Sequence, residues 1–129
     1  MEAGHRLVLQ ALPGSLAVVQ LAVGAEVPSW AWNGTFAAVV RTPDELSIVC
    51  DQNMVPEGVR AERDWVGLRV QGPFSFSQTG ILASLVGPLA ADSVSVVVVS
   101  TFDTDYILVK TDRLQRVREL LQAEGHFVG

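Results

Sequence analysis

Two short polar segments in the second half of the chain carry groups suited to binding a small charged molecule. Thr79-Gly80 precedes an apolar run of helical spacing, and residues 100–105 follow a run of valines. Free amides at the start of a helix attract a carboxylate, and glycine lets a ligand approach the backbone without interference from a Cβ atom. An aspartate in the second segment pairs with an ammonium group, and Phe102 covers an aliphatic stem. The candidate ligand-binding residues are Ser77, Gln78, Thr79, Gly80, Ile81, Thr101, Phe102, Asp103, Thr104 and Asp105.

The first of these segments lies between a predicted strand and a predicted helix. Apolar and polar residues alternate over 66–70, which predicts a half-buried strand. Apolar residues recur at helical spacing from Ile81, and Ser77 or Thr79 is placed to cap the resulting helix. Pro88 is expected to kink or shorten this helix because it lacks the donor for the carbonyl one turn back.

The second segment lies between two predicted strands. Residues 94–99 are β-branched and almost unbroken in their apolarity, which predicts a central strand covered on both faces. Residues 106–109 predict a strand that pairs with it as a hairpin. Another helix follows Thr111-Asp112 and stops at Gly125, after which residues 126–128 form a last short strand, with His126 at its start or capping the helix. The resulting β-α-β-β-α-β order is the ferredoxin-like arrangement, an antiparallel sheet with both helices on one face.

The first half of the chain predicts strands without long helices. Residues 7–9 and 16–19 flank Pro13-Gly14, a pair that favours a type II turn and hence a hairpin. Residues 36–40 and 46–50 predict two further strands joined by a turn. We therefore expect an α+β protein of two ferredoxin-like units with antiparallel sheets, divided into residues 1–62 and 63–129, the first with a reduced helical layer.

Composition excludes several classes of function. The chain has 129 residues and a net charge of -5, from 9 Lys+Arg and 14 Asp+Glu, and therefore lacks the basic surface that nucleic acid or an anionic membrane requires. One cysteine, Cys50, and two histidines give no zinc-type spacing and indicate a reducing, cytoplasmic location. We expect Cys50 to be a buried small hydrophobe. No Walker A loop, Gly-x-Gly-x-x-Gly or Gly-x-Ser-x-Gly sequence is present, so we expect neither an enzyme nor a bound cofactor or metal.

Residues 74–83 and 100–110, together with residues 42–50, resemble small bacterial tandem ACT-domain proteins related to the CASTOR-type arginine sensors. The resemblance implies regulatory βαββαβ modules that bind amino acids at interfaces between paired domains. It also implies that Gly80, Ile81, Thr101, Phe102 and Asp105 line the amino-acid pocket. The sensors carry two tandems in one chain and this chain carries one, so the resemblance further implies a homodimer.

Three hypotheses remain open at this stage. In the first, the chain is a sensor of arginine or another amino acid. In the second, the same residues are only helix caps and turns, and the chain is a ligand-free dimerisation or protein-interaction module, for which the edge of strand 94–99 offers a pairing surface. In the third, it is a regulatory subunit of an amino-acid biosynthetic enzyme. Trp30 and Trp32 either contact a partner or close the core of the first unit.

Overall fold

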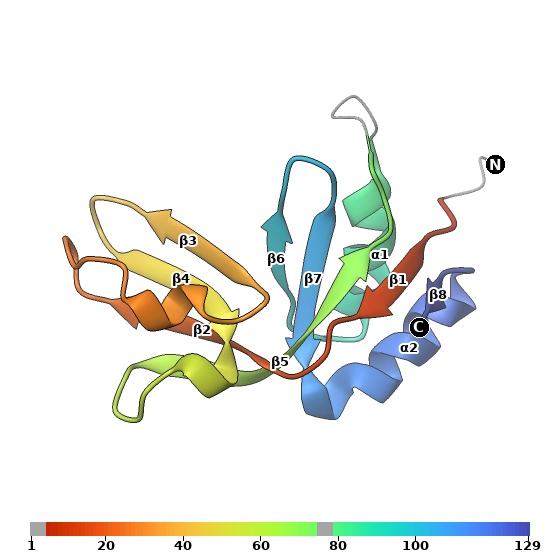
Figure 1. Ribbon diagram of the computed structural model, residues 1–129. Coiled ribbons are helices and arrows are strands. Elements are labelled where there is room, and N and C mark those ends of the chain that lie inside the picture. Colours follow the sequence, from red (N-terminus) through yellow and green to blue (C-terminus); the bar gives the residue numbers. More distant parts are fainter. Residues whose placement is uncertain (1–4, 75–78) are drawn as a thin grey trace. The chain divides into compact units, whose positions relative to one another are not determined.

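The computed structural model describes residues 5–74 and 79–129, and the chain divides into two compact units (Figure 1). Unit 1 comprises Met1–Leu12 and Val66–Gly129, and unit 2 comprises Pro13–Trp65. Unit 2 is thus inserted between the first strand of unit 1 and the remainder of that unit. This division differs from the expected one after residue 62, because the first strand pairs within the C-terminal unit.

In the described part of unit 1, five strands form a sheet that is accompanied by two α-helices. Its strands lie in the order β6-β7-β5-β1-β8, in which β1 is antiparallel to β5 and parallel to β8. The elements are β1 (Val8–Ala11), β5 (Ala61–Val70, of which the second half belongs to this unit), α1 (Ile81–Ala91), β6 (Val97–Ser100), β7 (Asp105–Lys110), α2 (Leu114–Ala123) and β8 (Phe127–Val128). From β5 onward this is the expected β-α-β-β-α-β order, and β1 is added to its sheet between β5 and β8.

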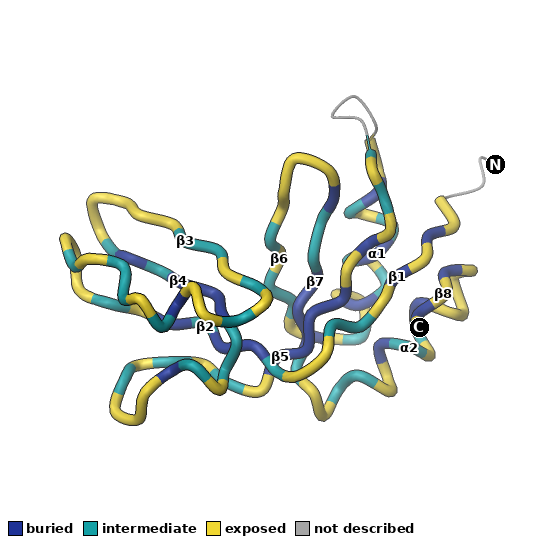
Figure 2. The backbone as a smooth tube through the Cα atoms, in the orientation of Figure 1, coloured by how far each residue is buried: buried dark blue, intermediate teal, exposed yellow. Residues whose placement is uncertain are grey.

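One apolar core joins the sheet of unit 1 to its helices. Alternate residues of the strands, such as Leu9, Leu68 and Ile107, pack with Leu85 of α1 and Leu121 of α2, and all five are fully buried. Figure 2 shows buried stretches along β5 and β7 of this unit. Residues of both helices share this core, which places the two helices on the same face of the sheet. Within the described residues, no helix is long and apolar enough to cross a membrane.

The valine-rich segment lies at an edge of the unit 1 sheet, so the prediction of a central strand is wrong. β6 pairs antiparallel with β7, as expected for the hairpin, but β7 and not β6 pairs with β5. Val94 is buried in the core before the strand begins, and Val98 within the strand is 38% exposed. The first part of the apolar run therefore belongs to the connection from α1 and is buried in the core. For this reason the sequence pattern resembles a central strand although β6 is an edge strand.

Unit 2, all of whose residues are described, contains strands and 3₁₀ turns but no α-helix. Its strand order is β3-β4-β2-β5, antiparallel throughout, with β2 (Leu16–Leu21), β3 (Ala37–Arg41), β4 (Leu46–Asp51) and the first half of β5. Short 3₁₀ turns occupy Ser29–Trp32 and Gln52–Met54. This confirms the reduced helical layer and the hairpin formed by residues 36–40 and 46–50.

The predicted hairpin across Pro13-Gly14 does not form. β1 pairs with β5 and β8, whereas β2 pairs with β4 and β5. Gly14 does adopt the positive φ of 76° that the turn pattern requires. The chain bends at Pro13-Gly14, but the bend separates two strands that pair elsewhere, because each completes a different unit.

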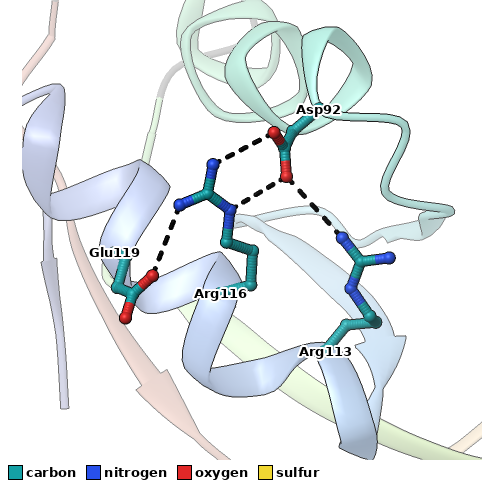
Figure 3. A network of polar contacts seen from close by, with 4 residues as sticks. All are labelled: Asp92, Arg113, Arg116 and Glu119. Atoms are coloured by element: carbon teal, nitrogen blue, oxygen red, sulfur yellow. Dashed lines mark hydrogen bonds and ion pairs between the residues drawn. The ribbon is translucent and has the colours of Figure 1, made fainter.

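A network of charged side chains joins the end of α1 to α2 (Figure 3). Arg116 binds Asp92 through both carboxylate oxygens, with its Nε 2.9 Å from Oδ2 and its Nη2 3.1 Å from Oδ1. Arg113 lies 3.6 Å from the same carboxylate, and Arg116 also contacts Glu119 at 3.4 Å. The hydrogen bonds from Arg116 hold the pKa of Asp92 below its usual range. The network therefore fixes a carboxylate at a helix C-terminus, a position that the helix dipole alone disfavours.

We predict that Asp92→Asn lowers the melting temperature at pH 7 because Arg116 loses its ionised partner. The folded-state pKa of Asp92 lies below the unfolded one. The stabilisation is therefore complete above the unfolded value, about 3.9, and is lost as the pH falls through the folded value. The melting-temperature difference between wild type and Asp92→Asn, followed from neutral to acid pH, should shrink only below about pH 4. Glu57→Gln, at an exposed carboxylate in unit 2, is the control, and an identical pH profile for both variants would contradict the assignment.

Candidate functional site

The two polar segments singled out in the sequence meet in unit 1 around a cavity of about 290 Å³. The beginning of α1 forms one wall and the turn between β6 and β7 forms the other. The lining residues are Phe74, Gly80, Ile81, Leu82, Ala83, Ser100, Thr101, Phe102, Asp103, Thr104 and Asp105. Seven of the ten candidate residues are among them. Ser77 and Gln78 lie outside the described residues, and Thr79 is not part of the lining.

The helical wall exposes the start of α1 without a side-chain cap. Gly80 occupies the N-cap position with a φ of 79°, a left-handed conformation that glycine adopts at no steric cost. Ser84 N–H donates to the Gly80 carbonyl at 3.0 Å and closes the first turn. The preceding amides of α1, carried by the lining residues 81–83, have no acceptor within the helix. Among the described residues of this wall, these amides are the groups suited to an anion.

The prediction that Thr79 caps α1 is wrong. The Thr79 carbonyl interacts with His5 Nε2 at 2.9 Å, and no side chain hydrogen-bonds to the Gly80 cap position. The reason is that the helix begins one residue later than a threonine cap would require. Ser77, the other predicted cap, lies outside the described residues.

The opposite wall is a turn held by its own threonines. The Thr101 N–H and hydroxyl both donate to the Thr104 carbonyl, at 2.8 and 3.0 Å, and the Thr104 N–H donates to the Thr101 hydroxyl at 3.2 Å. The Thr104 side chain is only 8% exposed, and its hydroxyl donates to the Val70 carbonyl at the end of β5. Phe74 N–H donates to the Asp103 carbonyl at 2.8 Å. The turn is therefore anchored to β5 and carries its aspartates on a rigid support.

The two aspartates of the turn differ in their surroundings. Asp105 lies opposite Ser100 in the β6–β7 ladder and accepts a hydrogen bond of 2.6 Å from the Ser100 hydroxyl at Oδ1. The exposed Asp103 carboxylate makes no hydrogen bond or ion pair with any described residue. None of the described residues lining the cavity is Lys, Arg or His. The cavity thus presents two negative charges without a basic side chain in its walls, an arrangement that favours a cationic group.

Four lining residues were not among the candidates from sequence. Leu82 and Ala83 belong to the same helical turn as Ile81, and Ser100 is the cross-strand neighbour of Asp105. The helical period and the hairpin register would have identified these three. Phe74 gives no such signal, because its place depends on a contact with Asp103 that the tertiary fold creates.

The remaining candidates of chemical interest have structural surroundings. Cys50 is fully buried in the core of unit 2, and burial, followed by the charge of Asp51, raises the pKa of its thiol. This is the setting of an inert small hydrophobe. Trp30 packs against the same core, whereas Trp32 is 57% exposed. Within the described residues, no three His, Cys, Asp or Glu side chains are grouped as a metal site would require.

Comparison with known families agrees with the fold. The model of the ACT domain matches residues 60–123, and a second model, described as an N-terminal domain, matches residues 14–58. A crystal structure of a protein from Agrobacterium tumefaciens superimposes with a TM-score of 0.93 at 39% identity, over 98% of this chain and 94% of that one. The chain belongs to the ACT-domain family. It is also similar to the human protein named "Putative protein CASTOR3P", at 33% identity over 102 residues, which are 69% of this chain and 63% of that protein.

Two further relatives carry informative names. The human protein named "Cytosolic arginine sensor for mTORC1 subunit 1" is 42% identical over 59 residues, which are 45% of this chain and 18% of that protein. This chain thus spans about a fifth of the length of the arginine sensors it matches. The regulatory subunit of aspartate kinase from Thermus thermophilus has a TM-score of 0.61 at 8% identity, covering 90% of this chain and 96% of that one, and shows a shared fold.

We predict that the Thr104 hydroxyl is what fixes the turn to β5. Thr104→Val leaves the buried Val70 carbonyl without its donor, so the free energy of unfolding should fall by about 1–3 kcal/mol. Thr104→Ser keeps the hydroxyl and should recover most of this loss. Denaturant unfolding of the two variants measures the difference, and equal stabilities would show that the hydroxyl does not carry the anchor.

Proposed function

We propose that this chain is a non-enzymatic regulatory protein that binds a small amino acid in the cavity between the start of α1 and the β6–β7 turn. The observation that carries the proposal is the pairing of opposite chemistries across one cavity. The start of α1, which no described side chain caps, lies on one wall and two carboxylates lie on the other. A zwitterion is the small molecule that satisfies both walls at once.

The geometry suggests a distinct role for each group. The α-carboxylate accepts hydrogen bonds from the amides of residues 81–83, where the helix dipole adds attraction. The ammonium group, or a cationic side chain, pairs with Asp103, whose carboxylate no described residue engages. Asp105, already oriented by Ser100, presents its second oxygen. Phe102, 79% exposed at the rim, covers the aliphatic part of the ligand.

The size of the cavity and the names of the relatives support this proposal. A volume of about 290 Å³ lies just below the range of typical small-molecule sites, about 300 to 1,000 Å³, and suits a ligand as small as an amino acid. A relative is named an arginine sensor, and a structural neighbour is a regulatory subunit of aspartate kinase. The relative's name also places it in the cytosol, which supports the cytoplasmic location expected for this chain.

One observation favours a second function, a homodimer or protein-interaction module. The edge strand β6 pairs with β7 alone among the described strands, and Val98 on it is exposed. A free apolar edge is a template for pairing with a strand of another chain. The two proposals are compatible in a dimeric sensor, and they separate if the dimer forms but no amino acid binds.

We predict that a selective amino acid raises the melting temperature of the protein. A ligand at 100 times its dissociation constant stabilises the folded state by about 2.7 kcal/mol, which for a domain of this size is several degrees. A thermal-shift screen of the twenty amino acids at millimolar concentration is the measurement. A flat response from folded protein would contradict the sensor function and leave the interaction module.

We further predict that the response depends on the carboxylates of the cavity. Asp105→Ala should abolish the ligand-induced shift in melting temperature. Asp103→Asn should weaken ligand binding at least tenfold, a loss of about 1.4 kcal/mol of binding free energy, because the ligand loses a charged partner. Asp44→Asn, on an exposed turn of unit 2, is the matched control and should respond like wild type. Unchanged affinity in both cavity variants would place the ligand elsewhere.

A further inference from the structure

Helix α1 contains a proline whose missing hydrogen bond has a specific consequence. In an α-helix each N–H donates to the carbonyl four residues earlier, and proline has no N–H to donate. Pro88 lies inside α1, so the carbonyl it leaves without a helical donor is that of Ser84. The helix nevertheless continues from Ile81 to Ala91. The expected shortening at Pro88 does not occur, which calls for another donor to Ser84.

The side chain of His126 supplies that donor. Its Nε2 lies 3.2 Å from the Ser84 carbonyl oxygen, and its Nδ1 lies 3.1 Å from the backbone nitrogen of Leu7. The Leu7 N–H can only donate, so Nδ1 must be the unprotonated nitrogen. The proton of the neutral ring is then on Nε2, where it points at Ser84. Two backbone groups thus define one tautomer of His126, a residue that is only 4% exposed.

The chain delivers this ring through the end of α2. Gly125 has a φ of 91° and its N–H donates to the Gln122 carbonyl, while the His126 N–H donates to the Leu121 carbonyl. These two bonds form a Schellman motif that ends the helix and turns the chain into β8. The backbone of His126 therefore has the helix-capping role expected from sequence. Its ring has a second role, in contact with α1 and the segment before β1.

We propose that His126 is a positioning residue for the ligand cavity: its neutral imidazole replaces the hydrogen bond that Pro88 cannot donate and holds the first turns of α1 in place. Residues 81–83, which line the cavity, lie directly before Ser84 in the same helix. The consequence for ligand affinity rests on the proposed function. The tautomer and the support of α1 do not, and they are tested separately.

The tautomer is tested by ¹⁵N NMR of the histidine rings in the full chain near pH 7.5. We expect His126 to show an unprotonated Nδ1 and a protonated Nε2. His5, an exposed residue whose ring nitrogen Nε2 lies 2.9 Å from the Thr79 carbonyl oxygen, serves as the internal reference. A protonated Nδ1 on His126 would overturn the proposal, because that ring could not accept from Leu7.

The replacement of the missing bond is tested by a double-mutant cycle between Pro88→Ala and His126→Ala. The Pro88→Ala substitution restores a backbone N–H for the Ser84 carbonyl, so loss of the imidazole should lower the melting temperature less in that background than in wild type. His126→Gln carries a donor and an acceptor in one amide and should rescue part of the loss. Equal costs of His126→Ala in both backgrounds would refute the replacement.

The positioning of α1 is tested by amide hydrogen exchange in the absence of ligand. In His126→Ala the Ser84 amide, which closes the first turn of α1, should exchange about tenfold faster, as expected for the loss of the partly buried hydrogen bond to the Ser84 carbonyl. Unchanged exchange would refute the positioning role. Where the amino-acid screen finds a ligand, His126→Ala should also lower the affinity for that ligand several-fold. If the screen finds no ligand, the proposed function is refuted, and the exchange result alone tests whether His126 positions α1.

Discussion

The arrangement of unit 1 depends on burying one apolar face of its sheet under two helices. Leu9, Leu68 and Ile107 on the strands share a core with Leu85 and Leu121 on the helices. Burial of such side chains contributes about 1.5–3 kcal/mol each, and many of them share this one core. The packed layer determines where α1 begins and where the β6–β7 turn lies. Apolar packing therefore positions the polar groups of the cavity.

A few polar contacts stabilise the points of unit 1 where regular backbone hydrogen bonding stops. Thr104 anchors the turn to β5, and Asp92 with Arg116 joins the end of α1 to α2. His126 joins α1 to the segment before β1 at the carbonyl that Pro88 leaves unpaired. Each of these contacts lies where a helix or strand ends or is interrupted, because regular backbone hydrogen bonds are missing there.

Much of unit 1 could be predicted because its elements carry strong local patterns. The alternation over residues 66–70, the helical spacing from Ile81 and the hairpin around residues 100–105 all appear in the structure. The place of β1 between β5 and β8 could not be predicted, since a short apolar strand does not specify its partner. The edge position of β6 could not be predicted either. The apolar residues just before the strand are buried in the core and extend its pattern, so the segment resembles a central strand.

The candidate site was predictable to the extent that it lies in two continuous segments. Seven candidate residues line one cavity because a helix start and a neighbouring turn meet at the same end of this fold. Phe74 and the ring contacts of His126 depend on partners 29 or more residues away, such as Asp103, Ser84 and Leu7. No periodicity signals such pairs. The availability of Asp103, in contrast with the engaged Asp105, likewise appears only once the side chains are placed.

The central claim is that the start of α1 and the β6–β7 turn bind one amino acid together. Titration of ¹⁵N-labelled protein with that amino acid, followed by amide chemical shifts, tests this most directly. The account predicts that saturable shifts concentrate at residues 80–83 and 101–105 and share one dissociation constant. Saturable shifts confined to residues 13–65, or shifts in only one of the two segments, would contradict it.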